Sequence, residues 1–361
     1  MSTLRLLANG DNFIYIASRV FDFAEKLKAE DMERAVINGI ARAMREVGIS
    51  PQENAPITFV PFRDTVQKKA GNQPTVHTQI QELTQRIYFE DIERLYKLFA
   101  LVGFFDGLSK DEGICMELGY AYGINKPIIL AMTDFVRADY KGIPNSEHIA
   151  DPVIESMASK IIYEYRIDEI EGTFKQQLQA SLRNLFAKVE KEIYLLGIES
   201  ARERQISQQD YSRASIVEHD VYIDFGGGLF EWQRTLQEQL ANKLSSMGWH
   251  CAVSSRYSNH SKFTDSATIK QLGWQDIQKA ESSKVVITCS DSVEMNSGTA
   301  AIQGFSRALG KKVLLYDSKT TNIVADNHYK SSRNLMIDYS ADKTVSRFDE
   351  IPNAVKELLI D

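Results

Sequence analysis

Two acidic residues that follow an apolar run by a few positions are the side chains of this sequence best suited to chemistry. The run 98–105 predicts a buried strand, and 116–123 predicts a short helix that leads to another strand at 128–132. Asp111 and Glu117 therefore lie where a strand ends and a helix begins, which is where parallel α/β sheets bind ligands. Apolar neighbours leave the Glu117 carboxylate half desolvated on a rigid element, which suits a nucleophile or an acid–base group. The alternative is that Glu117 only complements the helix dipole.

The segment 111–120, which reads DEGICMELGY, resembles the active-site segment of the nucleoside 2-deoxyribosyltransferases. In that family the glutamate of the motif attacks the anomeric carbon of a 2-deoxynucleoside, which here implies Glu117 as the nucleophile. The family also has an aspartate twenty positions before the motif's aspartate, and Asp91 stands at that distance from Asp111. The resemblance implies that Asp91 and Asp111 bind or protonate the nucleobase. It also implies that Tyr15 positions Glu117.

Further candidate substrate-binding residues follow the other predicted strands. Ser18 and Arg19 stand at the end of the first predicted strand, where they could contact the 5′ end of the sugar or a phosphate. Asn145 lies in the polar segment 133–151, and family members carry an asparagine in a similar loop that reaches a neighbouring subunit's site. The alternatives are a turn-forming role for Asn145 and an ordinary strand aromatic for Tyr15. The predicted substrate-binding residues are Tyr15, Ser18, Arg19, Arg63, Gly113, Met116 and Asn145.

The pattern of the first half of the chain recurs in the second half. Asp91 has a counterpart at Asp276, and Gly119 has one at Gly304, both at an offset of 185 residues. A repeat in constant register predicts two copies of one domain fold. We expect an α/β protein of two tandem Rossmann-like or flavodoxin-like domains, each a mostly parallel sheet with helices on both faces. The predicted divisions are a domain at 1–198, a linker at 199–215 and a second domain at 216–361. Predicted strands of the first copy are 13–18, 57–62, 98–105, 128–132 and 160–165, and its long helices are 24–47, 79–97 and 170–195.

The second copy lacks the carboxylate at the nucleophile position. At the same offset Glu117 corresponds to Ile302, and Asp111 corresponds to Asn296. Gln303 comes one position late, where a helix turns its side chain about 100° away. We therefore expect one working site, in the first domain, and a degenerate second domain.

A degenerate copy could still serve the first site. The family's enzymes are oligomers whose sites are completed by a neighbouring chain, so the second domain could act as a pseudo-subunit within the chain. Alternatively, the glycines 226–228 and the segment 297–299 could bind a nucleotide phosphate as a sensor.

Composition excludes several functional classes. The net charge of −7 argues against nucleic-acid binding, which needs clustered basic residues. The chain has no apolar run of transmembrane length and no signal pattern, so we expect no membrane association. Its three cysteines stand in apolar settings and indicate a reducing compartment, so we predict a cytoplasmic protein. The six histidines show no metal-ligand spacing, and we predict neither a metal nor a cofactor.

The predicted reaction is a double displacement at the anomeric carbon of a deoxyribose, with a small-molecule nucleoside as donor. Glu117 forms a covalent glycosyl intermediate, and a second nucleobase then takes the sugar. One alternative is an N-glycosidase that uses water as acceptor and cleaves a nucleoside or its 5′-monophosphate. Another is a nucleotide-binding sensor without turnover. We expect a homo-oligomer or an intrachain pseudo-dimer.

Overall fold

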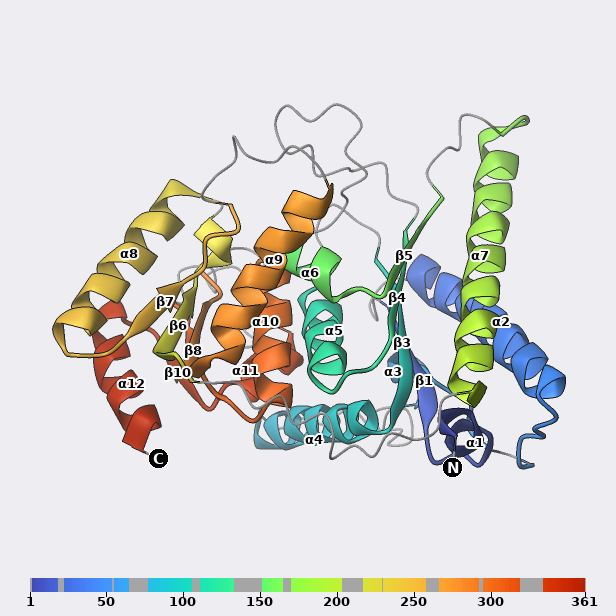
Figure 1. The fold of residues 1–361 in the computed structure, drawn as a ribbon, viewed down its shortest axis with the longest axis horizontal. Coiled ribbons are helices and arrows are strands. Elements are labelled where there is room, and N and C mark those ends of the chain that lie inside the picture. Colours follow the sequence, from blue (N-terminus) through green and yellow to red (C-terminus); the bar gives the residue numbers. More distant parts are fainter. Residues whose placement is uncertain are drawn as a thin grey trace. The chain divides into compact units, whose positions relative to one another are not determined.

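A computed structural model gives the fold (Figure 1) and shows two compact units. The first unit consists of Met1–Leu108, Asn125–Phe135 and Ala158–Arg213, and the second of Ser109–Ile124, Val136–Met157 and Ala214–Asp361. Each unit holds one five-stranded sheet whose strands pair in parallel. The chain therefore contains two tandem α/β folds, as predicted. The structure describes residues 2–18, 23–53, 55–64, 77–105, 111–132, 151–164, 170–202, 217–228, 230–257, 266–291, 295–318 and 334–360.

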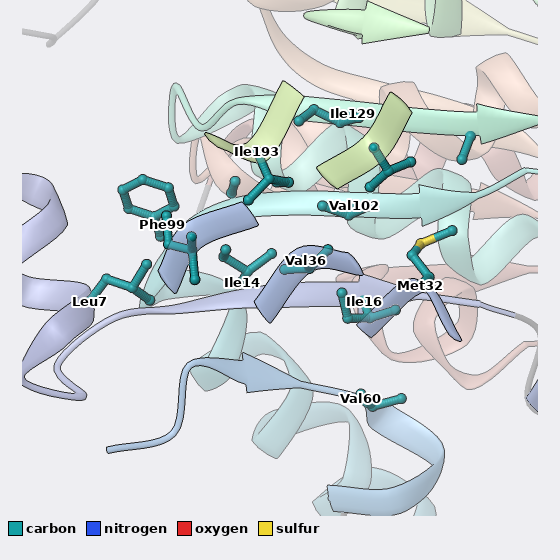
Figure 2. Packing of buried hydrophobic residues seen from close by; sticks show 14 of the residues in the cluster. Leu7, Ile14, Ile16, Met32, Val36, Val60, Phe99, Val102, Ile129 and Ile193 are labelled. Carbon is teal, nitrogen blue, oxygen red and sulfur yellow. The ribbon is translucent and has the colours of Figure 1, made fainter. Parts of the chain in front are cut away.

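The first unit packs long helices onto a buried parallel sheet. Its strands follow the order β2-β1-β3-β4-β5. Figure 2 shows the core, where Ile14, Val102 and Ile129 of the sheet lie near Val36 of α2 and Ile193 of α7. Strands buried along their whole length explain the continuous apolar runs in the sequence. The strands are β1 (Phe13–Ala17), β2 (Thr58–Phe59), β3 (Leu98–Phe104), β4 (Ile128–Met132) and β5 (Lys160–Tyr163), and the helices are α1 (Thr3–Ala8), α2 (Phe23–Glu46), α3 (Pro61–Asp64), α4 (His77–Tyr96) and α7 (Phe174–Arg202).

The second unit has helices on both faces of its sheet. Helices α8 and α12 form one apolar core with the strands, and α9 and α10 contact the strands from the other side (Figure 1). The strand order is β10-β9-β8-β6-β7. No described helix of either unit is both long and apolar enough to cross a membrane. The strands are β6 (His219–Asp224), β7 (Cys251–Val253), β8 (Ser283–Cys289), β9 (Lys312–Tyr316) and β10 (Lys343–Val345), and the helices are α5 (Glu112–Gly123), α6 (Pro152–Met157), α8 (Glu231–Ser246), α9 (Ser266–Glu281), α10 (Ser297–Ala308), α11 (Leu335–Ser340) and α12 (Ile351–Ile360).

Strand pairing gives the repeat an exact structural register. Tyr15 pairs with Leu101 in the first sheet, and Tyr222 pairs with Val286 in the second. Leu101 and Val286 are 185 residues apart, which is the offset found in the sequence. In both sheets the order corresponds to the 2-1-3-4-5 arrangement of flavodoxin-like folds. We call β1 to β5 with their helices the first repeat, and β6 to β10 with theirs the second repeat.

Three elements of the first repeat differ from the sequence prediction by three or more residues at one end or both. Helix α5 begins at Glu112, four residues before the predicted start, because Asp111 caps it. The strand predicted at 57–62 ends at Phe59, since Pro61 begins a short helix, a position where its missing N–H costs nothing. Helix α7 continues to Arg202 rather than ending at 195.

Helix α5 belongs by sequence to the first repeat but packs in the second unit, against its counterpart α10. A Cβ atom on Gly119 would lie 1.8 Å from the carbonyl oxygen of Ala301, and one on Gly304 would lie 1.9 Å from that of Met116. Residues 116 and 301 are counterparts, as are 119 and 304, so the crossing is symmetric. The two glycines allow the helix backbones to touch.

Candidate active site

The N-terminus of α5 is fixed by the first acidic residue of the motif. The Asp111 carboxylate accepts hydrogen bonds from the backbone N–H groups of Gly113 (2.9 Å) and Ile114 (3.1 Å). Such a cap satisfies backbone donors that the helix itself leaves unpaired. Asn296 caps α10 in the same way, through the N–H of Thr299. The residue at this position of the motif, Asp111 in the first repeat and Asn296 in the second, thus has a structural role in both, beside the nucleobase role that the resemblance implies for Asp111.

Glu117 is a buried carboxylate on the second turn of α5. Only 7% of the residue is exposed, and its neighbours Met116 and Leu118 are fully buried. A carboxylate in such a setting is poorly hydrated, which is favourable for a nucleophile. At the same position of α10 stands Ile302, which is also fully buried. The site position is therefore internal in both repeats, but only the first repeat has a reactive group there.

The neighbouring Gln303 does not replace the missing carboxylate. Its amide oxygen accepts a hydrogen bond from the Thr288 hydroxyl (2.8 Å). Its amide nitrogen lies 2.8 Å from the carbonyl oxygen of Ile337 and 2.7 Å from the hydroxyl of Ser340. Gln303 thus holds α10 to β8 and α11, which is a structural function.

A residue that the sequence interpretation missed lies beside the motif. A Cβ atom on Gly113 would lie 2.3 Å from Nδ2 of Asn334, so the glycine leaves room for this amide. The Glu112 carboxylate accepts hydrogen bonds from the backbone N–H groups of Asn334 and Met295, both at 3.0 Å. Asn334 also caps α11. The second repeat thus places a polar side chain at the N-terminus of the helix that carries Glu117.

The symmetry of the repeat could have identified Asn334. Asp151 precedes α6 as Asn334 precedes α11, and each caps its helix. Asp151 in turn lies against Gly298, the counterpart of Gly113. Asn145 is the residue that the resemblance suggested for reaching a neighbouring site from its loop. It lies outside the described residues, as does Arg19.

Asp91 is a buried acid of the first unit whose pKa is shifted upward. It stands on α4 and is 6% exposed, and its Oδ1 atom has no hydrogen-bond partner within the described residues. Burial, the larger cause, and the nearby Glu90 together raise the pKa of Asp91 to about 7, although Arg94 acts in the opposite direction. A carboxyl group that is half protonated near neutral pH is suited to donating a proton. Such an environment is typical of functional sites.

Tyr15 and Ser18 lie at the end of β1. Tyr15 is fully buried, with its ring centroid 5.4 Å from that of Phe59. Ser18 is buried too, and its hydroxyl oxygen finds no partner among the residues that the structure describes. Because β1 and β3 flank the point where the strand order reverses, Ser18 lies where such sheets bind ligands.

Arg63 already has protein partners. Its Nη1 donates to Oε2 of Glu33 (2.6 Å) and its Nε donates to Oδ1 of Asp64 (2.7 Å). Nη2 donates to both carboxylates as well. Four of the five guanidinium donors are thus used within the protein, and two carboxylates outweigh the single positive charge.

The structure groups the predicted residues in two sets. Asp111, Gly113, Met116 and Glu117 lie together on α5 in the second unit, and Tyr15, Ser18, Arg63 and Asp91 belong to the first unit. Among the described residues, no group of three His, Cys, Asp or Glu side chains could hold a metal ion.

Comparison with known families agrees with the repeat. The family model described as nucleoside 2-deoxyribosyltransferase matches residues 14–149 and again residues 221–338. Together these two regions cover more than half of the chain. No curated protein shows significant sequence similarity to it.

Proposed function

Because the chain belongs to the nucleoside 2-deoxyribosyltransferase family, we propose that it cleaves the N-glycosidic bond of a 2′-deoxynucleoside and transfers the sugar to another nucleobase. The observation that carries the proposal is Glu117, a buried carboxylate on α5 whose counterpart in the second repeat is Ile302. The first repeat alone has kept a group that can attack a sugar.

The proposed reaction has two steps. Glu117 attacks the anomeric carbon as the base departs, forming a glycosyl ester, and the electron pair of the broken C–N bond goes to the base. A second base then attacks the same carbon and releases Glu117. A carboxylate stabilises the oxocarbenium-like transition state of both steps, as in retaining glycosidases.

Asp91 is the proposed proton donor to the departing base. With its pKa raised to about 7, a large fraction of Asp91 carries the proton at neutral pH. In the second step the incoming base returns a proton to the same carboxylate, so the enzyme ends each cycle unchanged. Tyr15 would position Glu117, as the resemblance implies.

The second repeat is proposed to act as a pseudo-subunit. It packs α10 against α5 and brings Asn334 to the motif glycine Gly113. A fused copy keeps this pairing at all protein concentrations, whereas separate chains would lose it on dilution.

The test is base exchange followed by chromatography. The protein is incubated with 2′-deoxyinosine or thymidine, with and without adenine. Formation of deoxyadenosine that requires adenine supports the transferase. Release of free base at the same rate without adenine supports a hydrolase instead, and repeating the assay with deoxynucleoside 5′-monophosphates tests the nucleotide version. Absence of turnover with purine and pyrimidine substrates would refute a catalytic function.

A further inference from the structure

Arg256 is a completely buried cation in the second repeat, three residues beyond the end of β7. Its guanidinium group contacts three buried carboxylates. Nε lies 3.0 Å from Asp151, and Nη1 lies 2.8 Å from Asp224 and 3.3 Å from Asp276. Burying charges to this depth is unfavourable unless they are paired and hydrogen-bonded. The arrangement is thus a built site for a guanidinium group.

Every nitrogen of this guanidinium group has a partner. Nη1 also donates to the Ser254 hydroxyl (2.9 Å), and Nη2 donates to Oδ1 of Asn296 (2.8 Å) and to the Thr299 hydroxyl (3.0 Å). The backbone closes over it as well, because a Cβ atom on Gly227 would lie 2.6 Å from Nε of Arg256. The polar groups around this site are thus engaged by Arg256 itself.

The guanidinium group lies among the counterparts of the residues proposed for the active site. Asp276 is the counterpart of Asp91, and Asn296 is the counterpart of Asp111. Asp224 is the last residue of β6, next to the point where the strand order reverses. The groups that would contact a ligand in this repeat therefore contact the protein's own side chain.

Asp151 comes from the first repeat. Its Oδ1 accepts the backbone N–H of Val153 (2.9 Å) and so caps α6. Its Oδ2 accepts hydrogen bonds from Nε of Arg256 (3.0 Å) and from the hydroxyl of Tyr257 (2.6 Å). The same carboxylate thus connects a helix of the first repeat to the degenerate site of the second.

We propose that the second copy of the site is closed by the chain's own Arg256, which takes the place of a ligand and fastens the first-repeat residue Asp151 to the second repeat. Gly227 then serves to pack against Arg256, and its neighbours Gly226 and Gly228 lie against Gln233 and Arg234, so that these glycines do not serve to bind a phosphate. The inference does not rest on the chemistry proposed for Glu117, because it concerns a guanidinium site in the second repeat.

The experiment is chemical rescue of the full-length Arg256→Ala variant. Removing the cation takes an ion-pair partner from three buried carboxylates, and we expect the thermal midpoint to fall by about 10 °C. N-ethylguanidinium has the atoms that the substitution removes. At about 20 mM it should restore several degrees of the loss by binding the folded state only. An equal concentration of sodium chloride should not.

The matched control is Arg63→Ala, which removes the arginine at the corresponding position of the first repeat. This variant should lose only about 2 °C, because its guanidinium group is half exposed, and it should show no specific response to N-ethylguanidinium. An Arg256→Ala protein with the wild-type midpoint, or one that folds but is not rescued, would overturn the proposal.

A second variant keeps the test valid if Arg256→Ala does not fold. Arg256→Lys retains the charge but offers one compact donor group in place of the planar fork. We expect a loss of about 5 °C, and a lysine variant as stable as the wild type would contradict a site built for guanidinium.

Calorimetric titration of the Glu117→Gln protein measures how many nucleosides bind to each chain. Binding of two nucleosides per chain would overturn closure of the second site. Absence of nucleoside binding would count against the proposed function, and the thermal data would still decide the role of Arg256.

Discussion

Asp91 and Asp276 occupy the same position in the two repeats, but they have opposite surroundings. Asp276 accepts hydrogen bonds from Ser254 and Arg256, and Lys279 lies 3.2 Å from it. Asp91 is equally buried, yet its Oδ1 lacks a partner in the described part of the chain.

The cations next to these two aspartates also differ in how far their positive charge is shared with other groups. Arg94, the counterpart of Lys279, lies 4.0 Å from Glu90 and over the ring of Phe59. Its positive charge is therefore shared with other groups, and it does not offset the burial that raises the pKa of Asp91 to about 7.

This difference indicates which repeat is under functional constraint. A buried carboxyl group without sufficient partners destabilises the folded state, and it persists where its chemistry is needed. The second repeat has Ile302 at the position of the proposed nucleophile, and Arg256 pairs with its buried carboxylates. The comparison therefore predicts that equivalent substitutions in the two repeats have different, and in one case opposite, effects.

The largest expected effect is on turnover. Glu117→Gln keeps the size of the side chain but removes the nucleophile, and we expect kcat/KM for base exchange to fall at least about 10³-fold. Ile302→Val is the matched control at the corresponding position of α10. It should leave kcat/KM within about 2-fold and cost about 1 kcal/mol of stability. Retention of activity by Glu117→Gln would place the nucleophile elsewhere.

Asp91→Asn should lower activity and raise stability. The rise in pKa from 3.8 to about 7 corresponds to about 3 pH units. At about 1.4 kcal/mol per unit, the penalty on the folded state above pH 7 is on the order of 4 kcal/mol. Because the folded state binds the proton more tightly, this penalty is absent below pH 3.8 and grows until the pH passes 7. Denaturant unfolding of both proteins from pH 4 to 8 should therefore show a gain for Asp91→Asn that increases with pH.

The counterpart variant, Asp276→Asn, should behave oppositely. It weakens the pairing of Arg256 and should cost about 2 kcal/mol at neutral pH.

In the wild type, the activity should decline as the pH rises through 7, where Asp91 loses its proton, and Asp91→Asn should lower kcat about 10²-fold. Destabilisation by Asp91→Asn at pH 8 would show that a partner stabilises the charged form of this carboxylate.

The symmetric crossing of α5 and α10 predicts that equivalent glycine substitutions in the two repeats have equal effects on stability. Gly119→Ala and Gly304→Ala each introduce a Cβ atom less than 2 Å from a backbone oxygen of the partner helix. Separating the helices should cost about 3 kcal/mol in either variant. If α10 positions the helix of Glu117, both variants should lower kcat/KM by similar factors, as measured by base exchange at a temperature where both are folded. A loss confined to Gly119→Ala would show that the effect is local to α5.

The sequence was informative where hydrophobic runs and repeated spacing determine structure. The continuous apolar segments predicted the buried parallel strands, and the offset of 185 residues predicted the second copy and its missing carboxylate. The start of α5 was predicted less accurately. Asp111 caps this helix and so begins it earlier, and apolar periodicity does not reveal such a cap.

Arg256 and Asn334 could not be found from local pattern. Both lie in polar segments without periodicity, and their roles depend on contacts with residues more than 100 positions away. Only the strand register identifies Arg256 as the counterpart of Arg63, because Phe59 and Ala252 pair with equivalent tyrosines of β1 and β6.

The smallest expected effect concerns Arg63 itself. Its side chain is 40% exposed, and its ion pairs with Glu33 and Asp64 are screened by solvent. We expect Arg63→Ala to reduce the free energy of unfolding by about 1 kcal/mol, measured by denaturant titration. Since the guanidinium group is committed to two carboxylates, it is poorly placed to attract a phosphate, and the ratio of kcat/KM for a deoxynucleoside to that for its 5′-monophosphate should change less than about 3-fold. A selective rise in KM for the monophosphate would instead identify Arg63 as a phosphate ligand. In that case the two equivalent arginines would divide the functions, one binding substrate in the intact site and the other closing the degenerate one.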